Sequence, residues 1–62
     1  MNSDMAELST VATQIDELVS RVTEVAERYH GTDEDAAAVR LFEVERSLMS
    51  AGRSLRSAMR AF

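Results

Sequence analysis

The 62-residue chain contains no cysteine, no proline, no tryptophan and no lysine, and it has only two glycines, Gly31 and Gly52. Without cysteine, neither a disulfide framework nor a thiolate metal site can stabilise so small a chain, so its stability must come from packing. The lack of proline and the long stretches rich in Ala, Leu, Glu and Arg favour helices. The composition therefore predicts an all-α protein.

Long hydrophobic runs are also missing. No stretch approaches the ~18 consecutive apolar residues of a membrane-spanning helix, and the first residues lack the basic start and apolar run of a signal peptide. Hydrophobic residues make up 45% of the chain and charged residues 29%, which is typical of a folded domain rather than of a disordered chain. We therefore expect a folded cytoplasmic protein.

The sequence also lacks the residue patterns that carry chemistry. His30 is the only histidine, and there is no Glu-x-x-His pair and no glycine-rich phosphate loop. The acidic run Asp33-Glu34-Asp35 lacks the further ligands of a calcium loop. We predict no catalytic, cofactor-binding or metal-binding residues and no small-molecule ligand, and therefore a protein that is not an enzyme.

Two apolar stripes predict two long helices, at about residues 4–30 and 33–61. In both segments, apolar residues recur at alternating steps of three and four, which places them on one side of a helix. The stripes consist of Leu8, Val11, Ile15, Leu18, Val22, Val25 and Tyr29, and of Leu41, Val44, Leu48, Ala51, Leu55, Ala58 and Phe62. Met5, Ala12, Val19 and Ala26 lie alongside the first stripe and make it three positions per heptad wide.

The segment 30–32 is predicted to be a short turn. Gly31 can adopt the left-handed conformation that ends a helix, and Thr32 with Asp35 forms a capping box for the next helix. Asp33, Glu34 and Asp35 would then occupy the first turn of the second helix, where the helix dipole favours acidic residues. The chain 1–62 is thus predicted to be one antiparallel helical hairpin, with the two stripes forming its internal seam.

A lone hairpin of this size buries too little apolar surface to be stable on its own. The apolar residues Phe42, Met49 and Met59 beside the second stripe also require a partner. The simplest partner is a second copy, which would give a homodimeric four-helix bundle, and another helical protein is the alternative.

The second helix also carries a row of small residues. Side chains of this size allow close approach of two helix backbones, so we predict a partner interface here, and a solvated face is the alternative. The row consists of Ser47, Ser50, Ala51, Ser54, Ser57 and Ala58.

The charges are divided between the two halves of the chain. Residues 1–35 hold two arginines and nine acidic residues, a net charge of −7, whereas residues 36–62 hold five arginines and two acidic residues, a net charge of +3. Antiparallel packing would pair these charges, for example Arg56 with Glu7. Four of the five arginines in the second half share one side of the predicted second helix. They are Arg46, Arg53, Arg56 and Arg60.

These observations predict a protein–protein interaction module that acts as a scaffold, adaptor or regulatory subunit. The alternative function is binding of a polyanion or nucleic acid through the four arginines, since guanidinium groups match phosphate oxygens. The overall net charge of −4 and the lack of a DNA-binding motif favour the first function. We expect neither nucleic acid nor a membrane to be the main partner.

Overall fold

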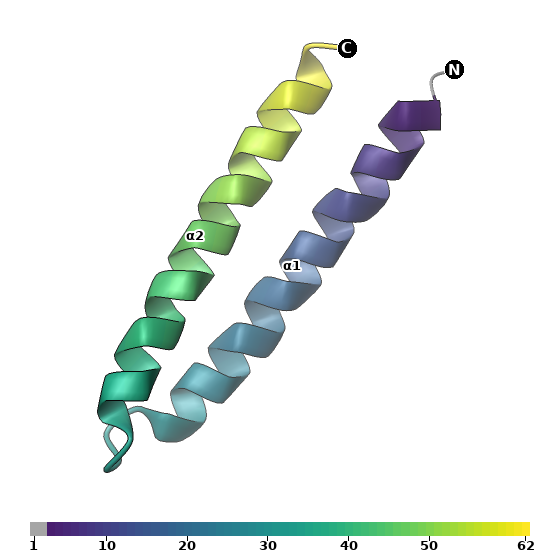
Figure 1. Cartoon of the computed structure of the whole chain (residues 1–62). Helices are drawn as coiled ribbons and strands as arrows, with labels where there is room; N and C mark the ends of the chain where they lie inside the picture. Colours follow the sequence, from purple (N-terminus) through teal and green to yellow (C-terminus); the bar gives the residue numbers. More distant parts are fainter. Residues whose placement is uncertain (1–2) are drawn as a thin grey trace.

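The computed structural model describes residues 3–62, which form an antiparallel helical hairpin (Figure 1). Helix α1 spans Ser3–Tyr29 and helix α2 spans Asp35–Arg60. The two helices lie side by side and form a rod whose Cα atoms extend over 51 × 15 × 9 Å. No strand occurs among the described residues. The predicted all-α class and the packing of two helices against each other are confirmed.

The turn between the helices is built around Gly31. This glycine has a φ of 77°, in the left-handed region that the sequence predicted. Its N–H donates to Oδ1 of Asp35 over 2.7 Å, and the Thr32 hydroxyl donates to the carbonyl of Tyr29 over 2.6 Å. The turn therefore links the last residue of α1 to the first residue of α2.

Helix α2 begins at Asp35, two residues later than the predicted position 33. Oγ1 of Thr32 accepts the N–H of Glu34 over 3.1 Å, and the carbonyl of Thr32 accepts the N–H of Asp35 over 3.0 Å. Because these bonds close a separate turn, Asp33 and Glu34 precede the helix, and only Asp35 lies in its first turn. The predicted capping box of Thr32 with Asp35 is wrong, because the Thr32 hydroxyl accepts from Glu34 and no side chain caps the start of α2.

The seam between the helices is lined by very small residues. Ala12 and Ala26 of α1 and Ala38 and Gly52 of α2 are buried. These positions are separated by multiples of seven residues on each helix, which is the repeat of two helices in continuous contact. Within residues 3–62, no large side chain is fully buried. The hairpin has close contact between backbones but almost no core of its own.

The predicted seam is therefore wrong in detail. None of the residues of the two apolar stripes is buried, and Leu18, Val44 and Phe62 are exposed by 42%, 44% and 70%. The physical reason is that alanine and glycine let the backbones approach more closely than leucine or valine would allow. The helices are rotated so that the small residues face each other. Some residues of the stripes border this contact, as Ile15 does beside Gly52, and others, such as Leu18 and Val44, lie outside it.

Candidate interaction surfaces

The two apolar stripes come together on one broad side of the hairpin. Each stripe has an inner row, next to the seam, and an outer row. We call the twelve residues of these rows the apolar face: Leu8, Ile15, Val22, Leu41, Leu48 and Leu55 in the inner rows, and Val11, Leu18, Val25, Val44, Ala51 and Ala58 in the outer rows.

Helix geometry places both stripes on the same side. On each helix, a residue of the inner row lies three positions after a small residue of the seam. Ile15, for example, comes three positions after Ala12, and Leu41 three positions after Ala38. In an antiparallel pair whose seam positions face each other, residues at this offset point to the same side of the plane of the two helices. Residues four after the seam positions point to the other side, where the contacts between Asp16 and Arg56 and between His30 and Phe42 occur.

The degree of burial follows these rows. All six residues of the inner rows are half-buried, whereas four of the six in the outer rows are exposed, namely Leu18, Val44, Ala51 and Ala58. No charged residue interrupts the face. An uninterrupted apolar surface along most of a small protein is typical of an interaction site.

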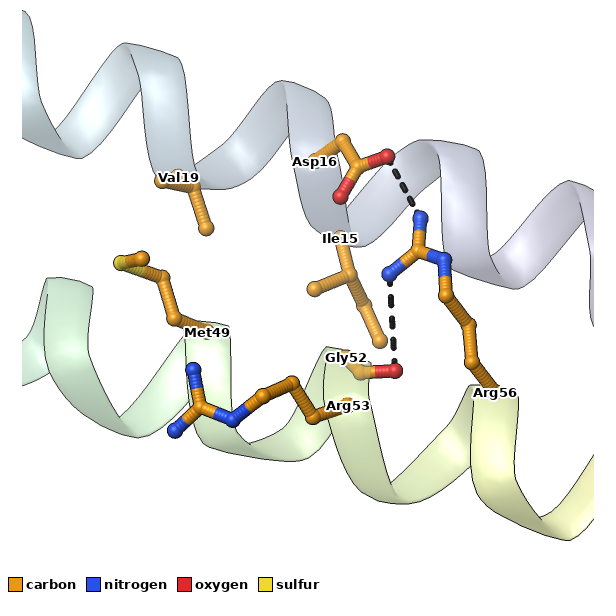
Figure 2. Close-up of a pocket in the computed structure, with 7 residues that line it drawn as sticks. All are labelled: Ile15, Asp16, Val19, Met49, Gly52, Arg53 and Arg56. Carbon is orange, nitrogen blue, oxygen red and sulfur yellow. Dashed lines mark hydrogen bonds and ion pairs between the residues drawn. The ribbon is translucent and has the colours of Figure 1, made fainter.

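The opposite side of the hairpin, which we call the polar side because it carries the ion pair between the helices, borders a groove that reaches into the seam (Figure 2). The groove has a volume of about 260 Å³ and is lined by Ile15, Asp16, Val19, Met49, Gly52, Arg53 and Arg56. Nη2 of Arg56 lies 2.7 Å from Oδ2 of Asp16, and Nη1 of Arg56 lies 3.5 Å from the Gly52 carbonyl. The groove is a shallow feature between the helices, with one ion pair across it.

Arg56 thus pairs with Asp16 rather than with the predicted Glu7. The Cα–Cβ bonds of helical residues tilt toward the N-terminus of their helix, so the long side chain of Arg56 reaches back toward Gly52. A Cβ atom on Gly52 would lie 3.4 Å from Cγ2 of Ile15, which shows that Gly52 lies opposite the segment of α1 that contains Asp16.

Three further contacts on or near the polar side join α2 to α1 or to the turn. The Thr23 hydroxyl donates to Oε2 of the half-buried Glu45. The rings of His30 and Phe42 meet edge to face at a centroid distance of 6.1 Å, and Nδ1 of His30 lies 3.5 Å from Oδ1 of Asp35. Of the residues predicted to need a partner, Phe42 and Met59 are thus half-buried in the hairpin, while Met49 is 45% exposed beside the groove.

The four arginines predicted to bind a polyanion, Arg46, Arg53, Arg56 and Arg60, differ in their surroundings. All four are exposed, and among the described residues Arg56 is the one of the four that forms an ion pair. Arg46, Arg53 and Arg60 recur every seven residues and form no ion pair with the described residues. They form a row along one side of α2, away from the apolar face.

The small residues of α2 are exposed in the hairpin. Ala51 and Ala58 belong to the outer row of the apolar face, Ser47 and Ser54 lie next to that row, and Ser50 and Ser57 lie further round the helix. The row therefore does not contact α1. Its predicted role as a partner interface stays a prediction.

The sequence interpretation did not single out two residues of the seam, Gly52 and Glu45. Glu45 and Gly52 lie seven and fourteen residues after Ala38. This heptad spacing is the signal in the sequence that could identify them. A glycine within a long helix costs stability unless close packing requires it, and a carboxylate between two helices fixes their alignment through its hydrogen bond.

The described part of the chain has no cluster of metal-ligating residues and no helix suited to span a membrane. No group of three or more His, Asp or Glu side chains lies close enough together to hold a metal ion. Neither α1 nor α2 is long and apolar enough to cross a membrane.

Comparison with known proteins gives no relatives. No family model, no curated protein and no solved structure matches this chain.

Proposed function

We propose that this chain is a non-enzymatic protein–protein interaction module that binds a second helical surface through its apolar face. A second hairpin on this face would complete a four-helix bundle, with the inner and outer rows as its core. The observation that carries the proposal is that both apolar stripes lie on one side of the hairpin and none of their residues is buried.

The surface area supports the same proposal. The hairpin exposes 4622 Å². A compact monomer of the same mass, 6.9 kDa, would expose roughly 4,000 Å². The excess is similar to the ~800 Å² that each partner buries in a standard interface. Coverage of the apolar face would also supply the core of large side chains that the hairpin lacks.

Paired substitutions test the role of the apolar face. Leu18→Glu places a charge in the middle of the face, and Val39→Glu makes the same kind of change at an exposed apolar residue outside it. We expect Leu18→Glu to lower the helix content and any assembled mass, because a charge buried without a partner is strongly unfavourable. Val39→Glu should behave as the unmodified chain does.

Circular dichroism and light scattering on the three proteins give the answer. If Leu18→Glu retains the helix content, mass and thermal stability of the unmodified chain, the apolar face is not an interaction site. The cytoplasm stays the predicted location of this module.

A second candidate function is polyanion binding through the arginines of α2. It is supported by the free row Arg46, Arg53 and Arg60, since arginines with no ion pair are available to phosphate groups. Changing all three to Gln should abolish binding to a heparin column at low salt. If the unmodified chain is not retained on that column, the arginine row has no such function.

A further inference from the structure

We propose that the partner on the apolar face is a second copy of this chain, packed with its turn at the opposite end of the bundle. The proposal rests on the proposed function, because it names the occupant of the same face. It also chooses between two symmetric arrangements, which differ in the helices that contact each other.

Both arrangements have a two-fold axis in the plane of the interface. An axis parallel to the helices places both turns at the same end, and α1 then contacts α2 of the second copy. An axis perpendicular to the helices places the turns at opposite ends, so α1 contacts α1 and α2 contacts α2. Each contact is antiparallel in both cases.

The apolar face is itself symmetric about its middle. The outer row of α1 is centred on Leu18 and that of α2 is centred on Ala51, with one member seven residues away on either side. Because Gly52 lies opposite Ile15, Leu18 and Ala51 are at nearly the same level along the rod. A two-fold axis perpendicular to the helices at this level therefore places the outer row of α1 opposite the same row of the second copy. The same axis does so for the outer row of α2.

The charges beside the apolar face distinguish the two arrangements. Glu7, Arg21 and Arg28 flank the outer row of α1, and Arg40 occupies the equivalent position on α2. Arg21 has an uncharged residue opposite it in both arrangements, so the other three charges distinguish them. With the turns at opposite ends, Glu7 lies opposite Arg28 of the second copy, and symmetry gives two such pairs. With the turns at the same end, Arg28 lies opposite Arg40 of the second copy, which gives two repulsive contacts.

Within the hairpin, Arg28 lies in the last turn of α1, where a cation is favoured by the helix dipole. Glu7 and Arg28 are both exposed, and neither forms an ion pair with any described residue. Salt screens the interaction between exposed charges that are far apart. The arrangement is therefore decided by charged side chains that are adjacent across the interface, and the net charge of each helix matters less. Local charge thus favours turns at opposite ends.

This arrangement also accounts for part of the small-residue row. The contact between the two copies of α2 would be formed by Val44, Ala51 and Ala58, with Ala51 at its centre and Ala58 opposite Val44 of the second copy. Ser47 and Ser54 would flank it. Side chains of this size allow the two α2 helices to approach closely. The predicted partner interface on α2 and the apolar face then become parts of one surface.

Distances between spin labels distinguish the arrangements directly. Asp33→Cys places a single label in the exposed turn of a chain that has no other cysteine. If the turns lie at opposite ends of the bundle, the distance between the two labels should be close to the 51 Å length of the rod. Turns at the same end predict about 20 Å or less, because only neighbouring helix diameters separate the labels. A short distance, or no dipolar coupling in a monomeric sample, overturns the proposal.

Charge exchange provides an independent test. Arg28→Glu should raise the dissociation constant of the dimer about fivefold, because two ion pairs become repulsive. The double variant Glu7→Arg with Arg28→Glu should restore it. With turns at the same end, Arg28→Glu would instead strengthen the dimer, which contradicts the proposal. These outcomes are separate from the Leu18→Glu test, which addresses the apolar face whatever its partner.

Discussion

The two glycines of the chain have opposite roles at the scale of single residues. Gly31 has a left-handed backbone that other residues adopt only with strain, whereas Gly52 lies within α2 at the seam, where a small residue is needed but alanine is also small enough. A Cβ atom on Gly52 would lie 3.2 Å from Nη1 of Arg56 and 3.4 Å from Cγ2 of Ile15. The first contact is with the mobile end of a side chain, so an alanine can be accommodated there.

Alanine substitutions should therefore change stability in opposite directions. We expect Gly31→Ala to lower the free energy of unfolding by about 1 kcal/mol, because its backbone requires a positive φ. Gly52→Ala should leave stability unchanged or raise it by up to about 1 kcal/mol, because alanine favours a helix. Urea denaturation at one protein concentration measures both. Equal destabilisation by the two changes would contradict these roles.

At the scale of the elements, the ion pair between Asp16 and Arg56 links α1 to α2. Both side chains are about half exposed, at 61% and 45%, so solvent and salt weaken their attraction. Asp16→Asn should lower the free energy of unfolding by less than about 1 kcal/mol, and this difference should disappear in 1 M salt. Asp33→Asn, in the exposed turn, is the control. An effect that persists in high salt would mean that Asp16 acts through packing.

A second prediction at this scale concerns the serines of α2. Ser54 lies beside the proposed contact between α2 helices, whereas Ser57 lies further round the helix. We expect Ser54→Leu to weaken dimerisation about tenfold, because overpacking of a close contact costs roughly 1–3 kcal/mol. Ser57→Leu should have no effect on the mass measured at a series of concentrations. Equal behaviour of the two variants would exclude Ser54 from the contact.

The helices and the turn were predictable from sequence, because local signals determine them. Alternating steps of three and four gave both helices, and Gly31 gave the turn, since each pattern depends on neighbouring residues only. The start of α2 was misplaced by two residues because Thr32 makes a turn of its own before the helix begins. Helix ends are sensitive to such single hydrogen bonds.

The rotation of the helices was not predictable from their apolar stripes. A stripe three residues wide shows which side of a helix avoids water, but not which part of that side faces the partner within the chain. That choice depended on Ala12, Ala26, Ala38 and Gly52, whose small volume allows close contact. For the same reason the apolar face was interpreted as the seam, although the seam lies at its inner edge.

At the scale of the whole molecule, the hairpin has two unlike sides. One side carries the apolar face, and the other carries the groove, the ion pair of Arg56 and the ring contact of His30. The polar contacts between the helices lie on or near the second side, so the first is left without any partner of its own. We propose that association covers the first side and completes the larger part of the apolar burial of this chain, whose own core is small.

The central claim is that the hairpin requires a second helical surface on its apolar face. The most direct test is the molar mass of the unmodified chain by light scattering over a wide concentration range, with a circular dichroism spectrum of each sample. We predict a helical dimer of about twice the chain mass of 6.9 kDa, which loses helix content as dilution dissociates it. A monomer that keeps its full helix content at every concentration would contradict the claim.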